Sequence, residues 1–422
     1  MKMKEKISIE EFDNKKFKIR FVEEDDNRKA ILTHYLHNYR NGVKKHYEKD
    51  AIEYLNQIVE YKNHEEKLNL VSDVALQQLL FEVENVPFPT PENYTFKFID
   101  LFAGIGGFRL ALQNLGGKCV FTSEWDENAK KTYRANFGET PFGDITKEST
   151  KSFIPDDFNV LCGGFPCQPF SHAGLKKGFE DTRGTLFFDV ADIINRRVEK
   201  GNPIDVIFLE NVKGLKNHDK GNTLKTIIKT LNNLGYEVKT EILNSKNFGV
   251  PQNRERIFIV AWLKDKNKTF KFPYGIDFEE SIIYEKDNLT KIKPTKVGDI
   301  LIKNPEEKYT ISDKLYAGHL RRRKEHKEKG NGFGFSSFDK NSSYTSTISA
   351  RYYKDGSEIL IEQKEANPRK LTPREAANLQ GYPKNYVIPV SDNQAYKQFG
   401  NSVSVPVIQT VFNEIKRQLL NL

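Results

Sequence analysis

Residues 159–171 read Asn-Val-Leu-Cys-Gly-Gly-Phe-Pro-Cys-Gln-Pro-Phe-Ser, and the rest of the chain is organised around them. The apolar start of this stretch indicates a buried strand, which stops at the two glycines. Cys167 then lies between two prolines, which fix φ and hold the preceding residues in extended geometry. A rigid loop at the end of a buried strand is where α/β proteins display reactive groups. A lone cysteine is more often structural, so its interpretation depends on the other motifs.

Strands and helices alternate on both sides of this stretch. The apolar runs predict strands at 96–100, 118–123, 142–145, 205–209 and 256–260. Helices are predicted between them at 108–115, 129–137, 189–198 and 224–234. Near-continuous apolar strands that alternate with helices indicate an α/β fold with a mostly parallel sheet and helices on both faces.

The flanking segments differ in pattern from this region. Apolar residues at helical spacing and three alternating prolines predict that residues 1–93 form a helical N-terminal extension and a linker. The alternating pattern covers 94–265 and is lost over 266–365, which predicts a smaller, irregular domain. Residues 366–422 contain two helical segments, the first opened by a capping threonine and a proline.

Composition restricts the possible classes of protein. The chain has 422 residues, enough for two or three domains, and a net charge of +8, which suits a polyanionic partner such as nucleic acid. Its three cysteines form no C-x-x-C pair, so we expect neither a disulfide framework nor a metal site. There is no signal-peptide pattern and no apolar run of membrane-spanning length, so we expect a cytoplasmic protein that does not bind membranes.

A glycine-rich turn, residues 101–107, follows the first predicted strand of the sheet and opens a helix. Such a turn directs backbone N–H groups at a polar or anionic ligand. It departs from the G-x-G-x-x-G pattern, because Arg109 stands where the third glycine is expected. This departure argues against a dinucleotide and favours S-adenosylmethionine.

Side chains suited to a nucleoside follow the next strands. Glu124 ends the second strand and can accept hydrogen bonds from both ribose hydroxyls. Asp144 ends the predicted third strand and can accept from an adenine amino group. Phe102 and Trp125 offer flat apolar faces for the adenine ring. Together with the glycine turn they indicate a nucleoside-containing cofactor.

Five motifs occur in a fixed order: the glycine turn, the cysteine loop, residues 210–212, residues 252–256 and residues 400–402. In this combination the chain resembles the DNA (cytosine-5)-methyltransferases of bacterial type II restriction-modification systems, over residues 94–422. The resemblance implies an S-adenosylmethionine-dependent methyltransferase fold with a target-recognition region in 266–365. It also implies that residues 366–422 return to the catalytic domain and complete the cofactor pocket.

The resemblance assigns roles to individual residues. It implies that Cys167 is the nucleophile, that Glu210 holds a proton against ring nitrogen 3, and that Arg254 and Arg256 meet the carbonyl oxygen and orient Glu210. The cofactor residues are Phe102, Gly104, Gly106, Glu124, Trp125, Asp144, Ile145, Leu186 and Asn401. The expected DNA contacts are Gln168, Ser171, Arg321 and Arg351. Gln168 and Ser171 could equally cap their loop, and Arg321 could equally lie on a solvated helix face.

The predicted function is methylation of carbon 5 of cytosine in a short double-stranded DNA site, with the base rotated out of the helix. We expect this methylation to protect DNA from a cognate restriction endonuclease. The endonuclease is expected to be a functional partner that does not bind the protein, and the protein is expected to be a monomer. The variable region is similar to those of enzymes that read CC-containing palindromes such as CCGG, CCWGG or CCNGG.

Three alternatives are open. Methylation of an exocyclic amino nitrogen uses an Asp/Asn-Pro-Pro-aromatic loop, where this chain has residues 165–168, Phe-Pro-Cys-Gln. Methylation of cytosine in RNA would use the same cysteine loop, but the long recognition region favours DNA. A DNA-binding regulator without catalysis is disfavoured by the presence of Cys167, Glu210 and Glu124.

Overall fold

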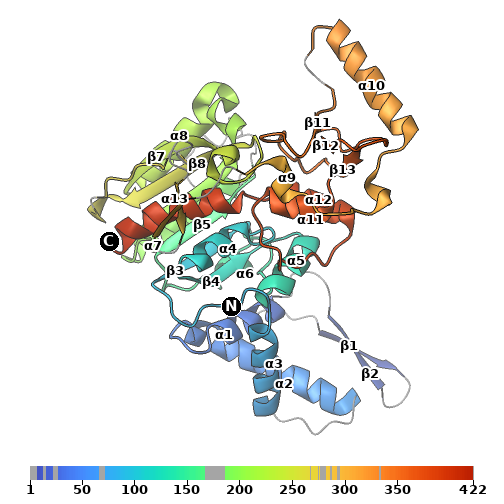
Figure 1. The fold of residues 1–422 in the computed structure, drawn as a ribbon. Helices are drawn as coiled ribbons and strands as arrows, with labels where there is room; N and C mark the ends of the chain where they lie inside the picture. Colours follow the sequence, from blue (N-terminus) through green and yellow to red (C-terminus); the bar gives the residue numbers. More distant parts are fainter. Residues whose placement is uncertain are drawn as a thin grey trace.

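The computed structural model describes residues 7–12, 16–21, 27–65, 72–166, 186–266, 268–273, 275, 282–285, 288–291, 295–331 and 334–421. Its centre is a six-stranded sheet with the order β4-β3-β5-β6-β8-β7 (Figure 1). The strands are β3 (Phe96–Leu101), β4 (Gly117–Ser123), β5 (Val160–Gly164), β6 (Val206–Val212), β7 (Tyr236–Asn244) and β8 (Glu255–Leu263). The predicted α/β fold is confirmed.

Four neighbouring strands, β4, β3, β5 and β6, are parallel, and β8 is antiparallel to both of its neighbours. The edge strand β7 was not predicted, because its alternation of half-buried and exposed residues lacks the apolar run of the central strands. The strand predicted at 142–145 is wrong. Only Phe142 pairs, in an isolated bridge to Ser123, because the chain turns at Gly143 and the Asp144 side chain accepts from Thr146 N.

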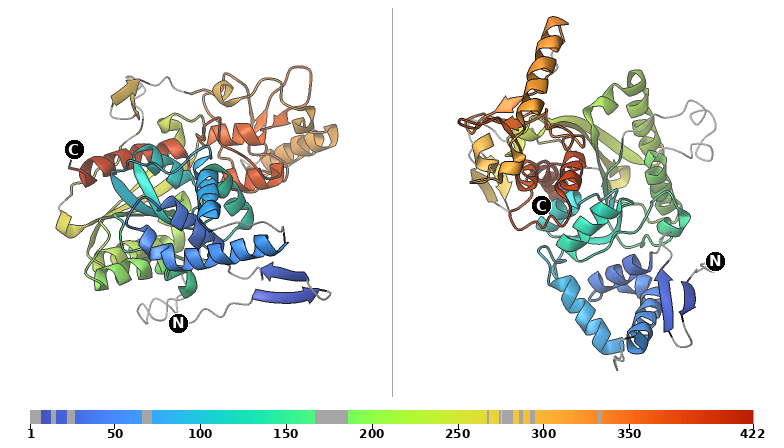
Figure 2. Two further views of the ribbon diagram at one scale, coloured as in Figure 1. Left: turned by 90° about the horizontal axis from the view of Figure 1, so that it is seen from below. Right: turned by 90° about the vertical axis from the view of Figure 1, so that its right-hand side faces the viewer.

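Side chains alternate between the two faces of the sheet, and each face is covered by helices (Figures 1 and 2). On one face Val160, Val206 and Phe208 pack with α4 (Gly107–Asn114), α5 (Glu127–Phe137) and α13 (Val405–Leu419). On the other face Leu161 and Ile207 pack with α7 (Leu186–Glu199) and α8 (Asn222–Asn233). The short helix α6 (Glu148–Lys151) precedes β5.

The N-terminal segment joins the second face of the sheet. The helices α1 (Arg28–His37), α2 (Lys44–Glu65) and α3 (Ser72–Glu84) share a hydrophobic cluster with the sheet and α7. Before them, β1 (Ile7–Phe12) and β2 (Lys16–Phe21) form an antiparallel pair that the helical prediction did not include.

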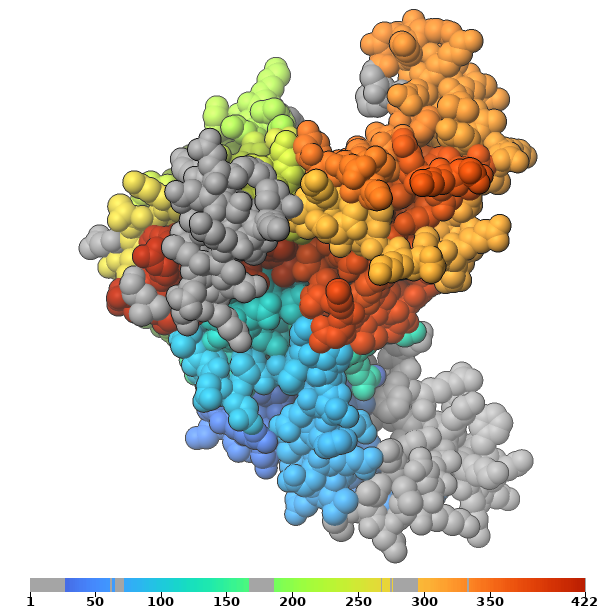
Figure 3. Space-filling view, in the orientation of Figure 1, coloured from blue at the N-terminus to red at the C-terminus, as the bar shows by residue number. Residues whose placement is uncertain are grey.

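The segment after β8 is less regular than the central sheet. It contains β9 (Ile282–Glu285), β10 (Asn288–Lys291), α9 (Val297–Ile300), α10 (Asp313–Glu328), β11 (Ser337–Phe338), β12 (Leu360–Ile361) and β13 (Arg369–Lys370). The helix α10 stands out from the body, and Figure 3 shows an open notch between it and the region of α8. Ile348 and Tyr352 belong to the same hydrophobic cluster as α13, so this segment shares its core with the sheet.

Two further helices, α11 (Pro373–Leu379) and α12 (Asp392–Asn401), lead into α13. Thr372 and Glu375 form a reciprocal capping box at the start of α11. Short 3-10 turns lie at Lys213–Lys216, His218–Gly221, Ser245–Phe248, Lys264–Lys266 and Glu307–Tyr309. Among the helices of the described ranges, none combines the length and apolar character needed to cross a membrane.

Candidate active site and cofactor pocket

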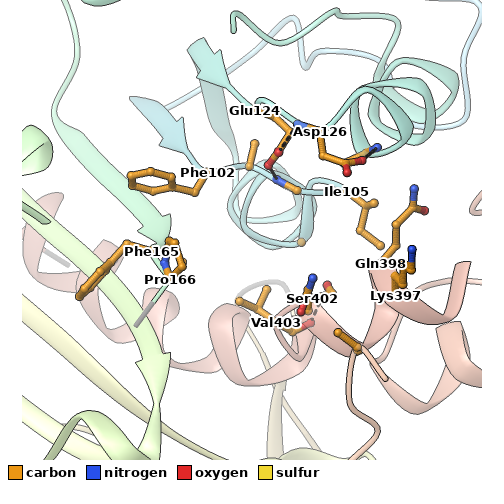
Figure 4. Close-up of a pocket in the computed structure, with 18 of the residues that line it drawn as sticks. Phe102, Ile105, Glu124, Asp126, Phe165, Pro166, Lys397, Gln398, Ser402 and Val403 are labelled. Atoms are coloured by element: carbon orange, nitrogen blue, oxygen red, sulfur yellow. Dashed lines mark hydrogen bonds between the residues drawn. The ribbon is translucent and has the colours of Figure 1, made fainter. Parts of the chain in front are cut away.

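A cavity of about 1100 Å³ lies beyond the carboxyl ends of the parallel strands (Figure 4). It brings together most of the predicted site residues from distant parts of the chain. Those lining it are Phe102, Gly104, Glu124, Trp125, Asp144, Ile145, Leu186, Glu210, Arg254, Arg256, Arg351 and Asn401. Cys167, Gln168 and Ser171 lie outside the described residues, and Arg321 lies elsewhere, on α10.

Two of the three glycines of the turn, Gly104 and Gly106, have different roles. Both adopt left-handed backbone geometry, with φ of 55° at Gly104 and 81° at Gly106. A Cβ on Gly106 would lie 2.3 Å from the Phe137 ring, so Gly106 permits close packing of the turn and does not line the cavity. A Cβ on Gly104 would have no neighbour closer than 4.0 Å. Gly104 therefore leaves open space on the cavity side, where a ligand can approach the backbone.

Glu124 is held by three backbone donors. Its Oε2 accepts from Gly104 N at 2.7 Å, and its Oε1 accepts from Trp125 N at 2.9 Å and Asp126 N at 2.8 Å. Burial raises the pKa of this carboxyl, and these hydrogen bonds oppose the shift. The carboxylate is thus fixed in orientation at the cavity wall (Figure 4), with further lone pairs available to hydroxyl donors.

The remaining cofactor candidates surround Glu124. Trp125 is 76% exposed, which leaves its ring free to cover a ligand, whereas Ile145 is buried. Leu186 is the first residue of α7, and Asn401 is the last residue of α12. Together these side chains form a mixed apolar and polar lining of the kind that holds a nucleoside.

Glu210 and Arg256 form an ion pair at the far side of the cavity. Glu210 lies near the end of β6, paired with Gly164 of β5, and its Oε1 is 3.1 Å from Arg256 Nε. Burial raises the pKa of the Glu210 carboxyl, opposed by the charges of Arg256 and Arg254. A buried carboxyl with a raised pKa beside a guanidinium is suited to holding a proton against a substrate.

Arg254 lines the cavity and also has contacts of its own with the backbone. Its buried guanidinium donates to Ile348 O at 3.2 Å, to Gly400 O at 3.3 Å and to Ser402 O at 2.6 Å. Burial, with the charge of Arg256, lowers its pKa to about 9. These bonds join the residue before β8 to the segment before β12 and to the C-terminal end of α12, so the geometry favours a positioning role.

Several lining residues had no predicted role. Asn211 Nδ2 donates to Phe165 O at 2.8 Å and fixes the chain as it leaves β5 toward Cys167. Lys397 and Gln398 of α12 face the cavity opposite Phe102 (Figure 4), and Ser402 Oγ is 2.7 Å from Tyr382 Oη. Their only sequence signal was proximity to Asn401 and Glu210.

The sheet, the glycine turn and the buried acid after the second strand define an α/β enzyme that binds a nucleoside-type ligand at the carboxyl ends of its strands. The C-5 cytosine-specific DNA methylase family matches residues 96–417, and the chain belongs to this family. It is a DNA cytosine-5 methyltransferase, as the motifs predicted.

Relatives and solved structures agree with this assignment. The type II methyltransferase M1.ScrFI of Lactococcus lactis subsp. cremoris is 53% identical over 342 residues, covering 81% of this chain and 83% of the relative. The type II methyltransferase M.HpaII of Haemophilus parainfluenzae is 50% identical over 372 residues, covering 84% of this chain and 98% of the relative. The fold is similar to the crystal structure of S. pombe Dnmt2 methyltransferase, with a TM-score of 0.59 and 21% identity over 78% of this chain and 99% of that one.

Proposed function

We propose that the protein transfers a methyl group from S-adenosylmethionine to carbon 5 of a cytosine rotated out of a short, specific DNA duplex site, through a covalent bond to Cys167. The observation that carries this proposal is that one cavity contains both the Glu124 cradle and the Glu210–Arg256 pair. A cofactor held at the first would lie beside a base held at the second.

The residues present fit S-adenosylmethionine. Gly104 leaves open space beside the turn, Glu124 offers oriented acceptors for the ribose hydroxyls, and Trp125 offers an exposed ring face for the adenine. Asp144 and Ile145 line the same end of the cavity, near the expected place of the adenine edge. When bound, this cofactor supplies an electrophilic methyl group.

The protein's own groups must make carbon 5 of cytosine nucleophilic. The thiolate of Cys167 adds to carbon 6, and the electron pair of the 5,6 double bond moves to carbon 5, which takes the methyl group. Glu210, with its raised pKa, holds a proton at ring nitrogen 3, and Arg256 balances its charge. Loss of the carbon-5 proton to water and departure of the sulfur as a thiolate then restore the aromatic ring and the starting form of Cys167.

DNA binding is assigned to the open side of the cavity and to α10. Arg351, Lys354 and Lys397 line the cavity and can meet phosphates. Arg321 is exposed on α10, the helix that borders the notch in Figure 3. We place target recognition in residues 266–365 and propose a CC-containing palindrome as the site, methylated to protect it from a cognate endonuclease.

The test is methyl transfer by Cys167→Ala. We expect this variant to lose transfer of tritiated methyl groups to plasmid DNA while it still binds duplex DNA. Bisulfite sequencing of plasmids from cells that express the wild type should show protected cytosines within one short sequence. Methyl transfer by Cys167→Ala at a rate near that of the wild type would overturn the covalent mechanism.

A further inference from the structure

The strand β4 is an edge of the central sheet, and helices of the N-terminal segment satisfy its outer side. It pairs with β3 on one side only. On the other side Thr122 N donates to His34 Nε2 at 3.1 Å, and Tyr47 Oη donates to Val120 O at 2.8 Å. Unpaired backbone groups on a buried edge are costly, so these side chains take the place of a neighbouring strand.

The helix α1 and its N-cap residue, Asn27, also hold the segment that follows α5. Thr140 N donates to Thr33 Oγ1 at 3.0 Å, and Gly143 N donates to Asn27 Oδ1 at 3.3 Å. Asn27, Thr33 and His34 are all buried. Three side chains at the start and in the middle of α1 thus accept hydrogen bonds from three backbone N–H groups of the catalytic domain.

These contacts end next to the cofactor residues. Phe142 N donates to Thr122 O at 2.8 Å, and Glu124 N donates to Phe142 O at 2.9 Å. The His34 ring packs on Phe142, with ring centroids 4.6 Å apart. Glu124 is therefore linked through two backbone hydrogen bonds, by way of Phe142, to Thr122, the residue that His34 holds. Asp144 directly follows Gly143, which Asn27 holds.

His34 acts here as a neutral acceptor. Its Nδ1 donates to Ala30 O at 2.8 Å, which leaves Nε2 to accept from Thr122 N. Burial lowers the pKa of the ring; nearby Glu139 opposes this shift, and Arg109 and His46 add to it. Glu139 Oε1 lies 3.4 Å from His34 Nε2. The same oxygen accepts a hydrogen bond from Arg109 Nη1 at 2.6 Å, so the charge of Arg109, on α4, compensates the carboxylate.

We propose that α1 supports the cofactor site. Its residues Thr33 and His34, and its N-cap residue Asn27, are positioning residues that hold Glu124 and Asp144 in their binding geometry. This inference rests on the proposed use of S-adenosylmethionine. It gives a role to a segment that lies outside the family match of residues 96–417.

The test compares two replacements of His34. His34→Leu removes the acceptor for Thr122 N, and we expect the calorimetric Kd for S-adenosylmethionine to rise about three- to tenfold, the effect of about one lost buried hydrogen bond. His34→Gln retains an acceptor at the end of the side chain and should stay within about twofold of the wild type. In both variants the affinity for duplex DNA should be unchanged.

A matched control separates positioning from loss of stability. Val59 is a buried residue of α2, away from the three hydrogen bonds. Val59→Ala creates a cavity there and should lower the melting temperature without changing cofactor affinity. Faster hydrogen exchange over residues 117–145 is expected in His34→Leu and not in Val59→Ala. If His34→Leu does not fold, Thr33→Val tests the same claim through Thr140 N.

The inference is overturned if folded His34→Leu, or Thr33→Val in its place, binds the cofactor as tightly as the wild type. It is also overturned if Val59→Ala weakens cofactor binding as much as the His34 replacement does. A wild-type protein that does not bind S-adenosylmethionine refutes the proposed function instead, and the exchange measurement then decides independently whether α1 holds β4.

Discussion

Replacing Asp100 with asparagine should remove a large pH dependence of stability. Asp100 lies on β3, directly before the cofactor turn, and is fully buried. Its Oδ2 has no hydrogen-bond partner within the described part of the chain. Burial raises the pKa of this carboxyl to about 8; Arg109 opposes the shift, and the nearby Glu124 adds to it.

The sign and size follow from linkage. In the unfolded chain an aspartate titrates near a pKa of about 3.9. Between that value and about 8 the folded protein keeps a proton that the unfolded chain loses, so the free energy of unfolding falls as pH rises. Each pH unit costs about 1.4 kcal/mol, so the contribution of Asp100 falls by about 4 kcal/mol between pH 5 and pH 8.

The assay is urea unfolding of the wild type and Asp100→Asn at several pH values from 5 to 8. The asparagine does not titrate, so the difference in unfolding free energy between the two proteins should shift in favour of the variant by about 4 kcal/mol across this range. The other buried titrating groups are common to both proteins and cancel. Asp73→Asn, which changes an exposed carboxylate of α3, is the control and should follow the wild type. Parallel pH profiles for the wild type and Asp100→Asn would refute the assigned protonation.

Four further predictions concern activity, stability and DNA binding. Glu210→Gln should keep the fold and lower kcat about 100-fold or more, because an amide cannot supply the proton at ring nitrogen 3, and near-normal single-turnover rates would dismiss Glu210 as the acid. Because the role of Glu210 requires its protonated form, the wild-type rate should fall as pH rises through the raised pKa, and Glu210→Gln should lack that limb of the profile. Arg254→Lys should lower the free energy of unfolding by about 3 kcal/mol, because one ammonium cannot span three carbonyls; unchanged denaturation with lost activity would favour a catalytic role instead. Arg321→Ala should weaken DNA binding a fewfold and reduce the slope of log K against log salt by about one, whereas an unchanged slope would place Arg321 on a solvated face.

The parts of the fold that could be predicted are those whose signal is local. The strands β6 and β8 each carry four or more consecutive apolar residues, and the start of α11 carries its cap in Thr372 and Glu375. The strand β7 escaped prediction because one of its faces is exposed and charged. Residues 142–145, Phe-Gly-Asp-Ile, were misassigned because the sequence does not reveal that Gly143 N is held by the side chain of Asn27, more than a hundred residues earlier.

The site shows the same division between local and distant information. Motif order was sufficient to predict the residues that face the cavity, because Glu124, Glu210 and Arg256 each lie at or near a strand end, where a parallel sheet collects them. Motif order could not show that the Arg254 guanidinium donates its hydrogen bonds to backbone carbonyls, since these partners are 94 to 148 residues away in the sequence. The two arginines lie two positions apart in one motif, so sequence alone treats them as equivalent.

The role of α1 was beyond sequence reasoning for a related physical reason. A histidine in a helix normally indicates either a surface or a satisfied core residue, and the partner of His34 is a backbone N–H, which has no sequence signature. The requirement arises from the sheet: β4 is an edge strand that also presents the cofactor acid, so any disorder of its outer side would reach Glu124. In this chain the covering groups are side chains of α1 and α2, which lie outside the family match. Removing α1 should therefore weaken cofactor binding before it affects the Glu210–Arg256 pair, which lies across the sheet on β6 and β8.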